Sequence, residues 1–130
     1  MKASVLHNFC TPPILEEVDD PVCGLSSVVV ELKACGVCRS DYHAWSGNDP
    51  DVKLPHIMGH ELAGVIVETG PEIEKFSIGD RVTVPFILGC GLCSDCQTGN
   101  STICDKQETI GFTIRGGFAQ FVEICFADFN

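Results

Sequence analysis

The stretch Cys90-Gly-Leu-Cys93-Ser-Asp-Cys96, followed by Cys104, decides how the middle of this chain folds. Its four thiols have the spacing C-x2-C-x2-C-x7-C, and a two-residue gap leaves neighbouring sulfurs on the same side of a tight turn. Four sulfurs fill a tetrahedral zinc shell and leave no place for water or substrate. The motif therefore predicts a closed, structural zinc site in a lobe of about residues 89–106, free or disulfide-bonded cysteines being the alternative. Any chemistry must lie elsewhere in the chain.

The length and charge of the chain limit the classes of protein to which it can belong. Its 130 residues are enough for one domain with a real core, and 45% of them are hydrophobic. Eight basic residues face eighteen acidic ones, which gives a net charge of −10. Phosphate backbones need clustered Lys and Arg, so the composition argues against a nucleic-acid partner despite the zinc motif.

The nine cysteines fit either a secreted, disulfide-bonded protein or a cytoplasmic one, and the N-terminal sequence distinguishes the two. A secreted disulfide framework requires a signal peptide, and residues 1–8 lack an apolar run of the required length. We therefore expect a cytoplasmic, reducing environment in which cysteines serve as metal ligands and small core residues. No stretch approaches 18 apolar residues, so we expect no membrane span.

The pattern of hydrophobic residues predicts a mainly β domain of the barrel or sandwich kind. Short β-branched segments separated by Gly and Pro predict strands, and a short polar segment at 37–45 predicts one or two helical turns. The expected strands are a short one within 1–9, then 27–34, 63–70, 82–86 and 118–124. There is no βαβ alternation and no G-x-G-x-x-G, so the chain carries no dinucleotide-binding unit of its own.

Cys38 and the pair His60-Glu61 are the candidates for chemistry. A thiolate and an imidazole leave zinc with open positions if at most one further protein ligand joins, and an open position distinguishes catalytic from structural zinc. From these residues alone, a buried cysteine and a hydrogen-bonded histidine remain the alternative.

Motifs around these candidates resemble the zinc-dependent alcohol dehydrogenases of the medium-chain dehydrogenase/reductase superfamily. The resemblance runs over nearly the whole chain, and it implies the GroES-like, partly open β-barrel of that family, with short helices and a four-cysteine zinc lobe. Besides that lobe, the matching motifs are Gly59-His60-Glu61-Leu62-Ala63-Gly64 with Gly70 and Ile73, Gly36-Val37-Cys38-Arg39-Ser40-Asp41, Gly79-Asp80-Arg81-Val82 and Gly116-Gly117-Phe118-Ala119.

The resemblance assigns roles at or beside a catalytic metal to four residues. It makes Cys38 and His60 ligands of a catalytic zinc, and Glu61 a nearby carboxylate that can approach the metal. Asp41 becomes the partner of His60, since a carboxylate there fixes the imidazole tautomer and raises its basicity. The alternative for Asp41 is that it merely favours the start of a helix.

Three further residues receive roles in the reaction or in cofactor binding. Ser40 holds the substrate oxygen and passes its proton on, and His43 occupies the place of a proton-relay histidine. Arg39 stands where some members contact the cofactor's pyrophosphate. A plain helix-start serine and a surface histidine are the alternatives for the first two.

The resemblance also implies what lies outside these 130 residues. Family members continue into a Rossmann domain, in cis or in trans, that binds NAD or NADP. The third ligand of the catalytic zinc is in this family also a residue beyond these 130. We therefore expect the chain to be the GroES-like portion, residues 1–130, of an enzyme that acts on a small alcohol or aldehyde, and to have little activity alone. The sequence does not decide whether it self-associates.

Three other readings compete with this one. The first is a free-standing GroES-like structural or interaction module that binds only structural zinc. The second is a zinc hydrolase with Glu61 as general base, against which the lack of an H-E-x-x-H pair argues. The third, a zinc-finger nucleic-acid binder, conflicts with the acidic composition.

Overall fold

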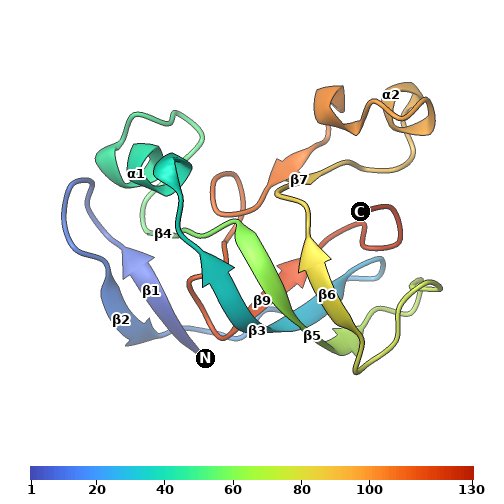
Figure 1. The fold of residues 1–130 in the computed structure, drawn as a ribbon, viewed down its shortest axis with the longest axis horizontal. Helices are drawn as coiled ribbons and strands as arrows, with labels where there is room; N and C mark the ends of the chain where they lie inside the picture. Colours follow the sequence, from blue (N-terminus) through green and yellow to red (C-terminus); the bar gives the residue numbers. More distant parts are fainter.

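Two long antiparallel strands, β3 (Val28–Gly36) and β5 (Glu61–Thr69), form the centre of the computed structural model, which describes residues 1–130. Strand β6 (Arg81–Val84) pairs with the outer edge of β5, and β9 (Phe121–Ile124) pairs with the outer edge of β3. The resulting sheet has the order β6-β5-β3-β9 (Figure 1). Its strands coincide with four of the segments that the β-branched pattern predicts, and the mainly β fold is confirmed.

A second sheet has the order β2-β1-β4, and Leu6 on its central strand shares a buried cluster with Ala44 of the helix α1 (Arg39–Ser46). It contains β1 (Lys2–Leu6), β2 (Ile14–Glu17) and the two-residue β4 (His56–Ile57). The sequence pattern did not predict β2, because its four residues do not alternate and follow two prolines. This strand forms because β1 offers it an antiparallel edge, and Ile14 and Leu15 remain largely exposed on it.

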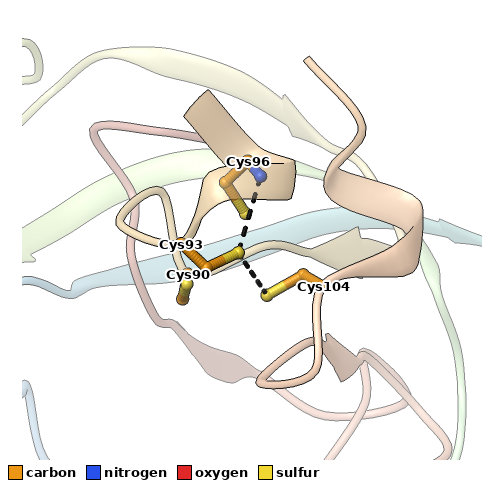
Figure 2. Close-up of side chains that lie close together, drawn as sticks. All are labelled: Cys90, Cys93, Cys96 and Cys104. Carbon is orange, nitrogen blue, oxygen red and sulfur yellow. Dashed lines mark hydrogen bonds between the residues drawn. The ribbon is translucent and has the colours of Figure 1, made fainter. Parts of the chain in front are cut away.

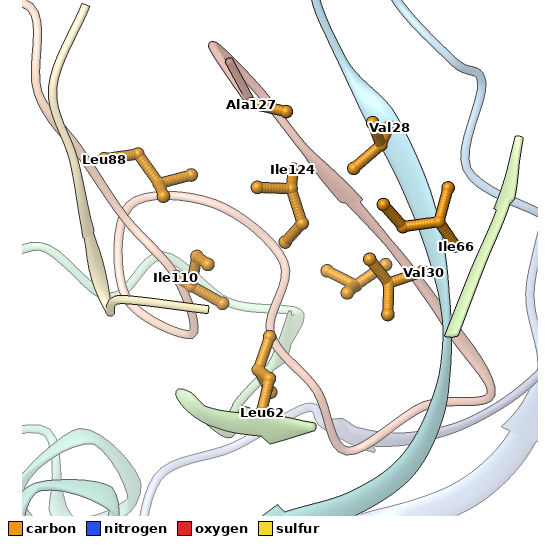
Figure 3. Close-up of a cluster of buried hydrophobic side chains, with 9 residues drawn as sticks. Val28, Val30, Leu62, Ile66, Leu88, Ile110, Ile124 and Ala127 are labelled. Carbon is orange, nitrogen blue, oxygen red and sulfur yellow. The ribbon is translucent and has the colours of Figure 1, made fainter. Parts of the chain in front are cut away.

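The main core lies against one face of the central sheet. Nine buried hydrophobic side chains form it, and Figure 3 shows them converging from β3, β5, β9 and the segments around β7 (Ile87–Leu88) and β8 (Glu108–Thr109). β-branched residues suit this position because their stiff side chains pack well on a pleated surface. The members are Val28, Val30, Leu62, Ile66, Leu88, Ile110, Val122, Ile124 and Ala127.

The cysteine lobe projects from this core between two short strands, β7 (Ile87–Leu88) and β8 (Glu108–Thr109), which pair with each other. It contains the helix α2 (Ser94–Gln97) and the 3-10 turn η1 (Ser101–Ile103). Leu88 is fully buried at its base, and the Asn130 side chain both accepts a hydrogen bond from Gly89 N and donates one to Gly89 O. The lobe therefore has a fixed base, while its tip extends away from the sheet (Figure 1).

The remaining helix, α1 (Arg39–Ser46), follows directly on β3. Its eight residues make it the longest helix in the chain. None of the helices has both the length and the apolar character that crossing a bilayer requires.

Candidate metal centres

The four thiols of the lobe converge on one point. Their sulfur atoms all lie within 4.8 Å of one another, and Cys93 Sγ is 3.8 Å from Cys104 Sγ (Figure 2). Sulfurs bound at about 2.3 Å to a tetrahedral ion would lie about 3.8 Å apart. All nine cysteines of the chain are free thiols. The cluster therefore fits a four-sulfur zinc site, and no disulfide competes for its members.

Local backbone geometry explains why these sulfurs meet. Cys93 is the N-cap of α2, and its sulfur accepts a hydrogen bond from Cys96 N, which places both side chains on one side of the turn. Gly91 adopts a φ of +72°, a conformation that suits glycine. The chain then returns through η1, so that Cys104 completes the set from the opposite side.

The protonation of the cluster also fits a cation. Neighbouring backbone N–H groups of Leu92 and Cys93 lower the pKa of the Cys90 thiol to about 6, whereas burial raises the pKa of Cys96 to about 12. The thiolate is the species that binds zinc, and a bound divalent cation deprotonates the thiols that coordinate it. The backbone N–H groups around Cys90 thus favour its thiolate form, and ion binding would convert the buried Cys96.

The second candidate centre is created by the pairing of β3 with β5. In this register Gly36, the last residue of β3, lies opposite Glu61, the first residue of β5. The residues just beyond these strand ends therefore meet, and Cys38 Sγ lies 3.2 Å from His60 Nε2 although 22 positions separate them in sequence. A thiolate sulfur and an imidazole nitrogen are both zinc ligands.

Asp41 connects the two candidate ligands. One carboxylate oxygen, Oδ2, accepts a hydrogen bond of 2.8 Å from Cys38 N in the capping box of α1. The other, Oδ1, lies 3.3 Å from His60 Nδ1. That second pair is not aligned as a hydrogen bond, and both atoms are buried without another partner. A ligand on Nε2 would place the imidazole proton on Nδ1, where Asp41 Oδ1 is the nearby acceptor.

The Cys38–His60 pair opens into a cleft of about 560 Å³. Ser40 and His43 line this cleft from exposed positions on α1, and Glu61 lines it from the start of β5. The Glu61 carboxylate lies over Gly36 and is not among the ligand atoms that converge with Cys38 and His60. Its approach to a metal stays a prediction.

Arg39 does not line the cleft. It is exposed at the first position of α1, and its side chain forms no ion pair or hydrogen bond within the chain. A guanidinium left free in this way is available to a group outside these residues, and its contact with a cofactor stays a prediction.

The structure adds cleft residues that the sequence did not predict. Asn48, Asp49 and Asp51 reach the cleft from the loop after α1, which the sequence marks only as a loop. Thr109 reaches it from the end of β8, and Phe112 from the turn that follows this strand. Only the folded arrangement brings these two segments to the same cleft, so no local pattern could have identified them.

Comparison with known proteins gives one consistent set of matches. Residues 24–127 match the model of the alcohol dehydrogenase GroES-like domain. An alcohol dehydrogenase of Geobacillus stearothermophilus is 42% identical over 123 residues, which is 93% of this chain and 36% of that protein. An NAD-dependent alcohol dehydrogenase of Sulfolobus acidocaldarius is 35% identical over 128 residues, 94% of this chain and 37% of that protein.

A solved structure also matches over nearly the whole of this chain. The cobalt- and zinc-bound thermostable alcohol dehydrogenase of Pyrobaculum aerophilum superposes with a TM-score of 0.84 at 34% identity, over 96% of this chain and 39% of that one. The chain therefore spans little more than a third of the length of the relatives that it matches.

Proposed function

Because the chain belongs to the alcohol dehydrogenase GroES-like domain family, we propose that it is the zinc- and substrate-binding portion of an enzyme that interconverts an alcohol with its aldehyde or ketone. In that reaction the C–H bond breaks and its electron pair leaves as hydride for the nicotinamide ring of NAD or NADP. The hydroxyl group loses its proton, and the C–O bond becomes a carbonyl.

One observation carries this proposal: Cys38, His60 and the buried Asp41 converge, and the first two line a cleft that Ser40 and His43 also line. Cys38 Sγ and His60 Nε2 would hold zinc, which as a Lewis acid lowers the pKa of an alcohol. Asp41 would fix the proton of His60 on Nδ1 and so leave Nε2 free to bind. The reported metal content of the Pyrobaculum relative supports a zinc-type site in this family.

The exposed side chains of α1 would handle the proton. Ser40 lies two residues after Cys38, so its hydroxyl can accept the proton of an alcohol bound in the cleft and donate its own. His43, one turn later on the same helix, would pass the proton to solvent. Both residues line the cleft, as this relay requires.

The rest of the machinery would lie in the remaining length of such an enzyme. A Rossmann domain, in cis or in trans, would bind the nicotinamide cofactor, with Arg39 reaching its pyrophosphate. The third zinc ligand would come from the same part. We therefore expect little turnover from the 130 residues alone.

Metal content tests the proposal directly. Zinc is counted by elemental analysis in the parent chain and in Cys38→Ala, after dialysis against a low zinc concentration. We expect two zinc ions in the parent and one in the variant, because the lobe retains its own ion. Cobalt exchange provides a second readout, since thiolate-to-cobalt charge-transfer absorption should fall in Cys38→Ala. One zinc ion in both proteins, with unchanged cobalt absorption, would refute a metal site at Cys38.

A further inference from the structure

The hydrogen bonds of the His60 imidazole do not by themselves fix its orientation. Its Nε2 lies 3.2 Å from Cys38 Sγ, a contact that a metal bound by both atoms would replace. Its Nδ1 faces Asp41 Oδ1 at 3.3 Å without an aligned hydrogen bond. The side chain is nevertheless only 6% exposed, so other groups surround the ring. These neighbours decide whether Nε2 is held toward Cys38 before an ion binds.

Two phenyl rings flank this imidazole. The ring centroid of Phe112 lies 5.3 Å from that of His60 at an interplanar angle of 50°, and the centroid of Phe86 lies 6.0 Å away at 66°. Aromatic rings at such separations attract each other and favour tilted or edge-on arrangements. Phe86 is 49% exposed, whereas Phe112 is only 8% exposed. Phe112 is therefore the better fixed of the two supports.

Phe112 is fixed because it also belongs to a buried core cluster. Its partners there are Leu6, Ala44, Val52 and Met58. Ala44 lies on α1 and Leu6 on β1, so two separate elements hold the ring. Side chains in a closely packed interior have little freedom to move. The core thus extends through Phe112 to the histidine of the cleft.

The backbone that leads into His60 is held by the segment that contains Phe112, Gly111–Phe118. Three consecutive amides of this segment donate hydrogen bonds to the three carbonyls before His60. The bonds run from Gly116 N to Ile57 O at 2.7 Å, from Gly117 N to Gly59 O at 2.8 Å and from Phe118 N to Met58 O at 2.9 Å. A Cβ atom at Gly111 would lie 2.7 Å from Gly59 O, so this close approach requires glycine.

We propose that the Gly111–Phe118 segment is a positioning element for His60, with Phe112 as its positioning residue. This inference rests on the proposed function, in which His60 Nε2 binds zinc. The three hydrogen bonds fix the backbone before His60, and the Phe112 ring fixes the orientation of the imidazole. A ring that is already oriented loses less conformational entropy when its nitrogen binds an ion. The segment thereby raises the metal affinity of a site to which it contributes no ligand.

The mobility of the His60 ring tests the positioning without a metal. The Cys38→Ala background removes the contact to Nε2, so packing and the backbone alone orient the ring there. Phe112→Leu keeps an apolar side chain in the core cluster but removes the aromatic ring beside His60. The order parameter of the His60 Cδ2–Hδ2 bond, measured by ¹³C NMR relaxation, should fall in Phe112→Leu. Phe76→Leu is the matched control, because Phe76 packs against the main core instead, and it should leave this order parameter unchanged.

Metal affinity tests the consequence in chains that retain Cys38. Co²⁺ is titrated in competition with a chelator into the parent and each variant, with zinc in the four-cysteine lobe. We expect the Cys38-dependent affinity to fall about fivefold in Phe112→Leu, because binding must then order a mobile imidazole. Phe112→Tyr keeps the ring and should restore most of the affinity, whereas Phe76→Leu should match the parent. The d–d absorption of the bound Co²⁺ should change only in Phe112→Leu, since these bands report ligand geometry.

The outcomes separate this inference from the function on which it rests. An unchanged order parameter in Phe112→Leu, an equal fall in Phe76→Leu, or a Co²⁺ affinity that Phe112→Leu does not alter would overturn the inference, even if the parent holds its Cys38-dependent zinc. Failure of Phe112→Tyr to restore the affinity would also overturn the role of the ring. A fall confined to Phe112→Leu, in a chain whose Cys38 binds no metal, would support the positioning of His60 and refute the proposed zinc site.

Discussion

Cys38 Sγ lies 3.2 Å from His60 Nε2 because the pairing of β3 with β5 ends at the Gly36–Glu61 step. The two residues do not lie in one turn, so their contact depends on the register of β3 against β5. Any change that weakens the pairing where these strands end should separate the two side chains. The residues around the pair therefore offer specific tests.

Asp41 should control metal affinity through its contact with His60, and a substitution can test this without disturbing the start of α1. Asp41→Asn keeps an oxygen that can accept from Cys38 N, but it replaces the carboxylate that faces His60 Nδ1. We expect the affinity for Co²⁺ at this site to fall about 10- to 100-fold, as for other partners of metal-binding histidines. Competition titrations with a chelator measure the change. Asp95→Asn, in the first turn of α2, serves as the control and should not alter this affinity.

Removal of the lobe ion should loosen the lobe and leave the sheet intact. Three buried cysteines and the partly buried Cys93 form their own cluster, separate from the nine-residue core of the central sheet. In Cys104→Ser, amide hydrogen exchange in residues 89–106 should accelerate strongly, while the amides of β3 and β5 remain protected. Cys23→Ser, a cysteine outside the four-sulfur cluster, provides the comparison. Equal loss of protection in both regions would show that the ion supports the whole domain.

The sequence was sufficient to predict those features that depend on neighbours along the chain. The four-cysteine lobe could be recognised because its thiols lie within 15 consecutive positions and its turns are local. The four strands of the central sheet were recognisable from their β-branched residues. The helix α1 was also recognisable, although its N-cap turned out to be the sulfur of Cys38.

Features that depend on contacts between distant segments were not predictable in the same way. The spacing of Cys38 and His60 gave no geometric signal, and only the family motifs suggested that they meet. Strand β2 required the exposed edge of β1, and the loop after α1 reaches the cleft only because Ala44 of α1 packs in a buried cluster with Leu6 and Phe112. Sequence periodicity contains none of this information.

Gly59, the residue before His60, should be required for stability for two reasons. Its φ is positive, and the space beside it has no room for a side chain. Gly59 has a φ of +97°, and a Cβ atom there would lie 2.7 Å from Phe118 Cδ1 and 2.9 Å from Phe118 N. Gly79 has a similar φ of +100° with no atom within 4 Å of a Cβ. Gly79→Ala should cost about 1–2 kcal/mol from backbone strain, and Gly59→Ala about 3–4 kcal/mol because the neighbouring backbone must also move. Urea denaturation measures both, and equal costs would mean that Phe118 yields freely.

His56 should make the stability of the chain depend on pH on the acid side. This side chain is 7% exposed in β4 and its Nε2 has no partner, and burial, assisted by the charge of Arg115, lowers its pKa below the ordinary 6.5. The carbonyl of Gly111 opposes the shift without cancelling it. In the unfolded chain His56 binds a proton near pH 6.5, whereas in the folded chain it does so only at lower pH. The unfolded state therefore binds more protons in that window, and the free energy of unfolding must fall as the pH falls below about 6.5.

The variant His56→Leu isolates this contribution, because leucine cannot titrate. Urea denaturation of parent and variant at several values between pH 7.5 and 5 should show the parent losing more stability than the variant. Ile57→Val, a change at the adjacent buried position of the same strand, should cost about 1 kcal/mol at every pH and so reproduce the slope of the parent. Parallel curves for the parent and His56→Leu would mean that His56 takes up its proton equally in the folded and unfolded chains.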